Sequence, residues 1–252
     1  MKIVASSLCI MILCSVCLAQ EADYYDWKGL KSYAAKNYTD SIVYFDRAIK
    51  QDPNYIDAWI HMGDAQRAVK DYNASLQSYY GALQIENNTK AAWSGMIAAY
   101  IALNSYSEAA RAAAKVTEIE PNRKENWQKE GDLLQMQGDY EEAMAKYESA
   151  LNLDQQYLDA LYRKGLSLMA LGNNKEALSL FDQVLAANPE HKLACNARGL
   201  ILEADGKYES AREAYENASQ LDPKWSLPKI NNVHSLLAQG MTDEAMRIFV
   251  TL

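Results

Sequence analysis

Apolar and small residues recur at three- and four-residue spacing in two consecutive stretches near the middle of the chain, residues 127–136 and 140–153. This spacing places them on one face of a helix in each stretch. Gly138 and Asp139 interrupt the pattern between the two stretches, which is typical of a tight turn. We therefore predict two amphipathic helices joined by a short turn.

The same pattern returns every 34 residues along almost the whole sequence. One period before Trp127 stands Trp93, and one period before that stands Trp59. A fixed period of this size is typical of repeat solenoids. Two amphipathic helices cannot bury all their apolar surface alone, so each pair must stack on its neighbours into a continuous core. The predicted fold is all-α.

Two columns of small residues predict where the paired helices approach. Helices that cross about 8–10 Å apart leave room only for small side chains. The second helix carries one in every unit: Ser41, Ser75, Ala109, Ala143, Ala177, Ala211 and Ala245. Glycine recurs in the first helix at Gly29, Gly63, Gly131, Gly165 and Gly199. Because glycine costs a helix roughly 0.8–1.0 kcal/mol against alanine, we expect a close backbone approach there.

An aromatic column and a proline column complete the unit. The aromatic residues are Phe45, Tyr79, Tyr147, Phe181, Tyr215 and Phe249, and the prolines that end the second helix are Pro53, Pro121, Pro189 and Pro223. These columns resemble the tetratricopeptide repeat (TPR), whose 34-residue pattern combines aromatic, Leu-Gly, Tyr, Ala and Pro positions. The third unit departs from this pattern, with Ile97 at the glycine position and Ala113 at the aromatic position.

The resemblance covers nearly the whole chain and implies a right-handed α-solenoid of about seven helix-turn-helix repeats. We assign the solenoid to residues 20–252, with repeats at 22–55, 56–89, 90–123, 124–157, 158–191, 192–225 and a shortened 226–252. These repeats leave no stretch long enough for a separate catalytic domain.

The first 19 residues have the pattern of a secretory signal peptide. Lys2 precedes an uncharged, mostly apolar run over residues 3–19, and Cys17 and Ala19 are small enough for the positions before a cut. Cleavage would leave Gln20 as the new amino terminus. The alternative is an uncleaved membrane anchor, because about 17 apolar residues are at the lower limit for spanning a bilayer. We expect an exported protein, secreted or in the envelope, and a membrane-anchored one if the leader remains.

Composition and spacing argue against several classes of function. The formal net charge is −8, and no basic stripe of the kind that binds nucleic acid is present. The three histidines, His61, His191 and His234, lie outside helical reach of one another, so no metal or cofactor is expected. The serines lack a nucleophile elbow, and the Gly172–Lys175 run follows a predicted helix, so it is a turn and not a phosphate loop. We predict that the protein is not an enzyme.

Cys195 is the only cysteine outside the leader, so no internal disulfide is expected. It stands in the column that holds Trp59, Trp93 and Trp127, which favours a buried, inert thiol over a reactive one. Asparagine glycosylation sequences occur at Asn37, Asn73, Asn87 and Asn217.

The resemblance implies that partners bind along a concave wall made by the first helices, at the second, fifth, ninth and twelfth positions of each repeat. The residues that we assign to the site are Asp26, Tyr33, Asp57, Asp64, Arg67, Asp132, Tyr162, Leu166, Met169, Leu200 and Ile230. Arg67 is the only Lys or Arg at these wall positions. The acids at the same positions are Asp23, Asp26, Asp57, Asp64, Glu125, Asp132, Asp159 and Glu203. Such an excess should attract a basic, partly apolar peptide or protein.

The predicted function is thus a non-catalytic protein-protein interaction scaffold outside the cytoplasm, present as a monomer or weakly self-associated. The alternative is a structural or assembly subunit of an envelope complex that associates through the solenoid ends. Ile248, Phe249, Val250 and Leu252 in the shortened last repeat would be partly bare, unless they tuck inward.

Overall fold

The computed structural model describes residues 20–250, so the predicted leader over residues 1–19 lies outside the described part. The described residues form helices joined by short turns, and they contain no strand. None of the described helices has the length and apolar character needed to cross a membrane. The chain divides into two compact units, Met1–Pro121 and Asn122–Leu252, which we describe separately.

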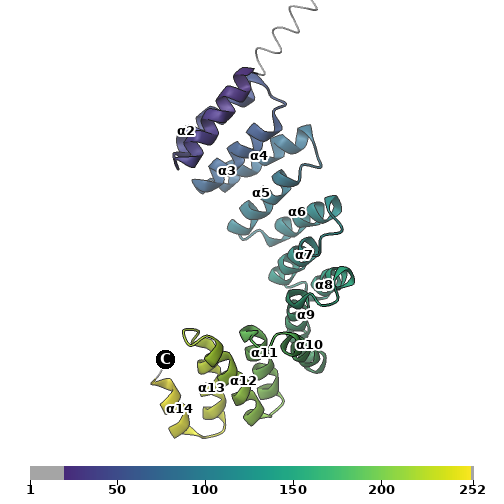
Figure 1. Cartoon of the computed structure of the whole chain (residues 1–252), viewed down its shortest axis with the longest axis vertical. Helices are drawn as coiled ribbons and strands as arrows, with labels where there is room; N and C mark the ends of the chain where they lie inside the picture. Colours follow the sequence, from purple (N-terminus) through teal and green to yellow (C-terminus); the bar gives the residue numbers. More distant parts are fainter. Residues whose placement is uncertain (1–19, 251–252) are drawn as a thin grey trace, which may run out of the picture. The chain divides into compact units, whose positions relative to one another are not determined.

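The first unit stacks helix pairs in chain order (Figure 1). Residues 20–34 are helical and form the first member of the first pair. The helices that follow are α2 (Tyr38–Gln51), α3 (Ile56–Ala68), α4 (Tyr72–Ile85), α5 (Lys90–Ala102) and α6 (Tyr106–Ile119).

The second unit continues the same arrangement with four more pairs. Its helices are α7 (Lys124–Gln137), α8 (Tyr140–Leu153), α9 (Leu158–Ala170), α10 (Asn174–Ala187), α11 (Lys192–Ala204), α12 (Tyr208–Leu221), α13 (Leu227–Ala238) and α14 (Thr242–Phe249). The first helices of three successive pairs begin at Lys124, Leu158 and Lys192, 34 residues apart.

The first helix of each pair lies on the inner side of its unit. Every helix from α3 onward packs on its neighbour in the pair, and successive first helices also touch: α3 with α5, and α7 with α9, α9 with α11, and α11 with α13. Within each unit, successive second helices from α2 onward make no such contact. The second helices are therefore spread apart on the outer side of each unit.

The recurring glycines make room for an aromatic ring, which corrects the expected close approach of two backbones. A Cβ built on Gly131 would lie 2.7 Å from Cε1 of Tyr147 in the paired helix, and one built on Gly165 would lie 2.6 Å from Cε1 of Phe181. Both rings are fully buried. Each glycine thus offsets its helix cost by admitting a large buried side chain.

The third repeat redistributes this volume between its two helices. Ile97 of α5 stands at the glycine position, Ala113 of α6 stands at the aromatic position, and both are buried. The bulky side chain has moved from the second helix to the first, so the departure from the pattern leaves a filled core. The small column of the second helices is buried in every repeat as predicted: Ser41, Ser75, Ala109, Ala143, Ala177, Ala211 and Ala245.

The turn inside each pair places one residue in the left-handed region. Glycine occupies this position in the second unit, at Gly138, Gly172, Gly206 and Gly240, with φ between 73° and 96°. Gly172 therefore belongs to a helix-ending turn, as predicted. The first unit has Lys36, Lys70 and Asn104 at the equivalent positions, with φ of 60°, 65° and 57°. These three residues adopt a backbone conformation that disfavours side chains with a Cβ.

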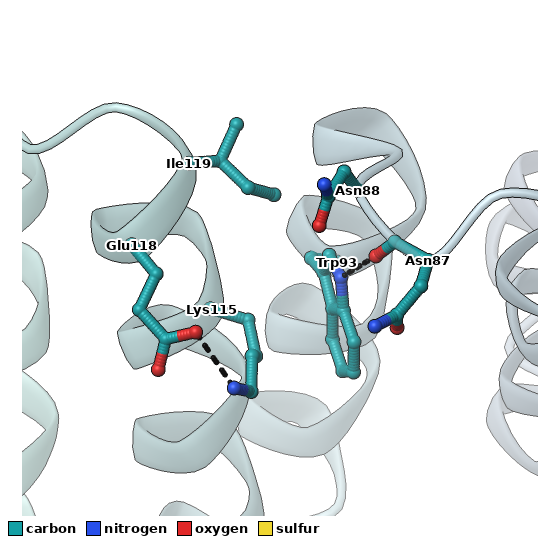
Figure 2. Close-up of a pocket in the computed structure, with 6 residues that line it drawn as sticks. All are labelled: Asn87, Asn88, Trp93, Lys115, Glu118 and Ile119. Carbon is teal, nitrogen blue, oxygen red and sulfur yellow. Dashed lines mark hydrogen bonds and ion pairs between the residues drawn. The ribbon is translucent and has the colours of Figure 1, made fainter.

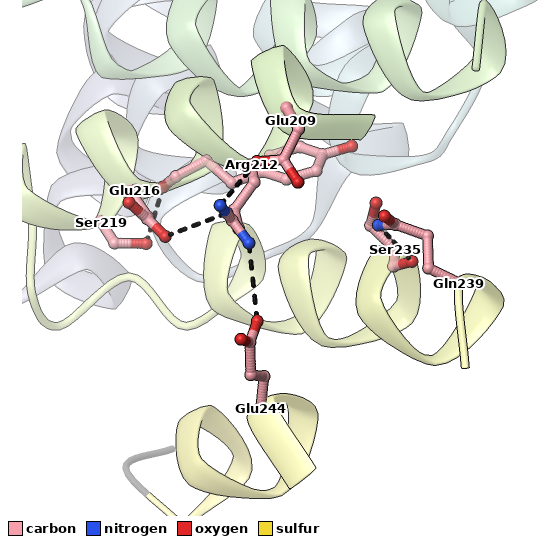
Figure 3. A network of polar contacts seen from close by, with 8 residues as sticks. Glu209, Arg212, Glu216, Ser219, Ser235, Gln239 and Glu244 are labelled. Atoms are coloured by element: carbon pink, nitrogen blue, oxygen red, sulfur yellow. Dashed lines mark hydrogen bonds and ion pairs between the residues drawn. The ribbon is translucent and has the colours of Figure 1, made fainter. Parts of the chain in front are cut away.

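An ion-pair network fixes the last helix of the second unit (Figure 3). Arg212 of α12 lies 2.6 Å from Glu209 and 3.9 Å from Glu216 on its own helix, and 3.5 Å from Glu244 of α14. The outer surface of α14 nevertheless stays bare, since Phe249 is 57% exposed and Val250 is 76% exposed. These two side chains do not tuck inward.

Candidate protein-interaction surface

In the first unit, two of the acids assigned to the binding wall are committed to contacts inside the protein. Asp26 is only 5% exposed, and its Oδ1 lies 2.8 Å from Nδ1 of His61 in the next repeat. This burial removes Asp26 from any partner, contrary to its assignment. Oδ1 of Asp64 accepts hydrogen bonds from the Tyr79 hydroxyl at 2.7 Å and from Arg67 at 3.1 Å.

The remaining assigned residues of the first unit differ in accessibility. Asp57, in the first turn of α3, is exposed. Tyr33 is half-buried, and its ring meets that of Tyr38 edge-on with centroids 5.1 Å apart. Arg67 donates to both Asp64 and the Tyr79 hydroxyl, so much of its hydrogen-bonding capacity is used within its own repeat. Asp57 is the assigned side chain that faces solvent most openly in this unit.

The interaction between His61 and Asp26 joins two neighbouring repeats and perturbs the histidine. Partial burial alone lowers the pKa of His61, but the hydrogen bond with Asp26 and the charges of Asp26, Asp57 and Asp64 outweigh this effect. The pKa of His61 is therefore raised from its ordinary value of 6.5. A protonated His61 would strengthen the contact between the first two pairs.

In the second unit, Asp132 also has an internal role. Its Oδ1 accepts a hydrogen bond from the Tyr147 hydroxyl at 3.0 Å and lies 3.4 Å from Nε of Arg163 on α9. Burial raises the pKa of Asp132, although Arg163 and Tyr147 act in the opposite direction. Glu125 on α7 and Asp159 on α9 remain exposed. These two acids lie on first helices that contact each other.

The apolar residues assigned to the site are partly used as core. The Tyr162 ring packs against Phe181 and His191 with centroid distances of 5.8 Å and 5.0 Å. Leu166 and Met169 pack on the buried cluster of the same repeats, and Ile230 is half-buried. Leu200 is the assigned apolar residue that is most exposed, at 37%.

Leu200 belongs to an exposed leucine face on α11 and α13, two first helices that touch each other. The other members of this face are Leu193, Leu227 and Leu237, and the four side chains are between 37% and 49% exposed. All four stand at the second, ninth or twelfth repeat positions. Leu193, Leu227 and Leu237 thus stand on the predicted wall, although they were left out of the residues assigned to the site.

Cys195 and the glycosylation asparagines are the other residues singled out from the sequence. Cys195 is buried and free, as predicted, and burial raises the pKa of its thiol, which keeps it protonated. Within residues 20–250, no group of three His, Cys, Asp or Glu side chains is arranged to hold a metal ion. The four glycosylation asparagines, Asn37, Asn73, Asn87 and Asn217, are exposed.

Comparison with known families and structures agrees with this architecture. Three models of the tetratricopeptide repeat match the chain over residues 66–129, 131–172 and 162–224, together more than half of its length. A tetratricopeptide repeat protein from Parabacteroides merdae superposes with a TM-score of 0.70 at 16% identity, over 91% of each chain. No curated protein sequence matches the chain significantly.

Two other similar structures have more specific descriptions. YrrB, described as a TPR protein with an unusual peptide-binding site, gives a TM-score of 0.59 at 22% identity, over 73% of this chain and 95% of YrrB. MamA from Desulfovibrio magneticus RS-1 gives a TM-score of 0.57 at 25% identity, over 64% of this chain and 91% of MamA. The chain therefore belongs to the tetratricopeptide repeat family, whose repeats serve as scaffolds for protein-protein interaction.

Proposed function

We propose that this protein is a non-catalytic scaffold outside the cytoplasm that binds a basic, partly apolar peptide or protein segment on the inner face of its first helices. The observation that carries the proposal is the leucine face of α11 and α13. Leu193, Leu200, Leu227 and Leu237 present apolar surface to solvent on two helices in contact. Apolar patches that a folded protein leaves exposed commonly mark interaction sites.

The exposed acids of the second unit supply the preference for a basic partner. Glu125 and Asp159 lie in the first turns of α7 and α9, where a negative charge also suits the helix dipole. The dipole explains their presence without a partner, so the leucines carry more weight. Once present, however, the acids attract cationic segments to the same inner face.

Selection from a random peptide library tests the proposal directly. We expect selected peptides to combine Lys or Arg with aliphatic or aromatic residues, and their binding to be lost in Leu200→Ser with Leu237→Ser. The matched control is Leu153→Ser with Leu221→Ser, which removes equally exposed leucines from second helices. Equal losses in both double variants would contradict a site on the inner face.

Export is the second part of the proposal, and it rests on the leader over residues 1–19. Amino-terminal sequencing of the natural protein should find Gln20 at the start of a processed chain. An unprocessed chain in the membrane fraction would favour the retained anchor, whereas Met1 on a soluble cytoplasmic protein would refute export.

The exposed surface of α14 favours a second candidate, an assembly subunit of an envelope complex. Met246 and Phe249 of this helix, and Val250 directly after it, are each more than half exposed. Light scattering over a range of protein concentrations distinguishes the two functions. Mass that rises with concentration, and returns to the monomer value in Phe249→Ser, would support assembly through α14.

A further inference from the structure

In two repeats of the first unit, a tryptophan of the first helix is held at its indole nitrogen by a backbone carbonyl. Trp59 packs beside Ile49 of α2, and a Cβ built on Gly81 of α4 would lie 2.6 Å from its indole ring. Its Nε1 donates a hydrogen bond to the Pro53 carbonyl, 3.0 Å away and six residues earlier. The indole thus lies against two second helices and is held by a backbone acceptor.

Trp93 is held in the same way one repeat later. Its Nε1 donates to the Asn87 carbonyl at 2.8 Å, again six residues earlier. Figure 2 shows the indole beside this turn, with Lys115 and Ile119 of α6 across the hollow. The repeat therefore has a standard place for an indole ring, with a carbonyl acceptor at its edge.

In the second unit, Cys195 of α11 occupies this tryptophan column, and a hollow of about 320 Å³ remains beside it. Leu185 and Ala186 of α10 line one side, and Ala214 and Asn217 of α12 line the other. Leu185 and Asn217 stand four repeats after Ile49 and Gly81, the two residues next to Trp59. Asn217 has a Cβ where Gly81 has none, so an indole here could not take the place that Trp59 takes. Trp93 is the closer template, because its indole lies beside Lys115, which stands at the same repeat position as Asn217.

The polar edge of this hollow is also preserved. Pro189 stands six residues before Cys195, as Pro53 stands before Trp59, and in the part of the chain that the structure describes no hydrogen bond reaches its carbonyl. Arg198 lines the hollow and is held by Asp182, with Nε 2.8 Å from Oδ1. A guanidinium fixed in this way can lie over an aromatic ring.

We propose that the hollow over Cys195 is a pocket for an aromatic side chain, tryptophan above all, presented by a partner protein. The chain supplies its own template for the ligand, because Trp93 shows that an indole fits this column beside a residue with a side chain. The volume is at the lower end of the roughly 300–1,000 Å³ range of ligand pockets, which suits one side chain better than a cofactor. Tryptophan is also among the residues that contribute most to protein interfaces.

The pocket is separate from the leucine face, because it opens between second helices on the outer side of the unit. The apolar lining from Leu185, Ala186 and Ala214 would contact the ring, and the Pro189 carbonyl would accept the indole hydrogen. Phenylalanine lacks that donor and should bind more weakly than tryptophan. The partner thus gains a second anchor that the inner face does not provide.

Titration with N-acetyl-L-tryptophanamide, followed by amide NMR shifts, tests the pocket even while the partner is unidentified. We expect saturable shifts centred on Ala214 and Asn217 with Kd of about 1 mM, typical of one buried side chain without other contacts. N-acetyl-L-alaninamide should cause no such shifts. Absence of saturation at about tenfold that concentration would overturn the proposal.

Two variants supply matched controls. Cys195→Trp should fill the hollow, abolish the shifts and raise the melting temperature, whereas Trp59→Cys should open an equivalent hollow and gain a second site. If Cys195→Trp fails to fold, Cys195→Leu replaces it, because Leu161 already occupies this column in the core of another repeat. Shifts that persist in the folded filled variant would overturn the assignment of the pocket.

A last arm identifies the source of the side chain. Two otherwise identical peptides, one with Trp and one with Ala at a central position, should differ in affinity for the wild type by about tenfold or more. The same two peptides should bind Cys195→Trp with nearly equal affinity. A concentration-dependent dimer that Cys195→Trp dissolves would make a second copy of this chain the occupant, and would overturn a partner protein.

Discussion

The hydroxyl of buried Tyr79 donates a hydrogen bond to Oδ1 of Asp64, 2.7 Å away across the α3–α4 pair. Tyr147 makes the equivalent contact with Asp132 across α7–α8, at 3.0 Å. In both pairs the acid stands fifteen residues before the tyrosine. A buried hydroxyl without a partner is costly, so each acid has a structural reason to be present.

Leucine stands at the acid's position in the two repeats whose buried ring has no hydroxyl. Leu30 precedes Phe45 by fifteen residues, and Leu166 precedes Phe181 by the same distance. Tyr215 has a hydroxyl, yet Leu200 stands fifteen residues before it. Its hydroxyl donates instead to Glu203 at 2.6 Å, so this buried tyrosine has an acidic acceptor too. The buried tyrosines therefore explain the presence of three wall acids without any partner. These acids are Asp64, Asp132 and Glu203, and each accepts a tyrosine hydroxyl.

The first prediction concerns the Tyr215–Glu203 pair, in which one acceptor serves a fully buried ring. Glu203→Leu should lower the free energy of unfolding by about 1–3 kcal/mol, since it leaves the Tyr215 hydroxyl without its acceptor. Adding Tyr215→Phe should recover most of this loss. Chemical denaturation of the single and double variants measures the coupling.

Glu203→Gln is the control, because its amide oxygen can still accept the hydrogen bond. Strictly additive effects of Glu203→Leu and Tyr215→Phe would show that the contact does not stabilise the repeat.

The fold could be predicted from the sequence because each repeat presents the same sizes at the same spacing. Gly131 and Tyr147, sixteen residues apart, specify how one pair packs, and the same spacing returns in four other repeats. The recurring glycine does not reveal by itself which group lies against it. A neighbouring backbone and an aromatic ring would both need the space that a missing side chain leaves. The third repeat shows that only the summed volume matters, since Ile97 and Ala113 exchange the large and small positions.

The accessibility of the residues assigned to the binding surface was predicted less well, for a physical reason. Repeat position tells which side of the solenoid a residue occupies, but burial depends on what the adjacent repeat offers. Asp26 lies at an inner position, yet His61 from the next repeat covers and binds it. Leu237 lies at an inner position too, yet it is 49% exposed. These pairings across repeats vary from one repeat to the next, so the period does not reveal them.

The second prediction concerns the left-handed turn residues of the first unit. Lys70→Gly should raise the free energy of unfolding by about 1 kcal/mol, because a side chain with a Cβ pays that cost at positive φ. Thermal unfolding of the variant measures the gain. Gly138→Ala is the reverse control, and it should destabilise by a similar amount although no atom lies within 4 Å of the added Cβ. A less stable Lys70→Gly would mean that chain entropy outweighs the relief of strain.

The third prediction is a pH dependence from His61. Its pKa is raised in the folded protein, so protonated His61 stabilises the contact with Asp26. This contribution is fully present below about pH 6.5, the unfolded value, and is lost as the pH rises through the folded pKa. Denaturant unfolding between about pH 6 and 8 should show stability falling with pH, and His61→Gln should flatten that slope.

Asp26→Asn provides the companion variant, since it removes one of the three charges that raise the His61 pKa while keeping an oxygen near the ring. It should flatten the slope as well. An unchanged slope in both variants would assign the pH dependence to other groups.

The fourth prediction concerns the encounter of a basic partner with the inner face of the second unit. Glu125→Lys with Asp159→Lys should slow association of a selected basic peptide and reduce its dependence on salt, because charges at the rim of a site act mainly on the encounter rate. Leu200→Ser should instead speed dissociation.

Asp132 is unsuitable for this test, because it accepts the hydrogen bond of Tyr147 and its loss would disturb the fold. Glu141→Lys with Glu213→Lys, on exposed positions of the second helices, is the charge-matched control. Stopped-flow association at several salt concentrations decides the result: if the two double variants slow association equally, the net charge of the protein steers the partner and the inner acids serve only their own helices.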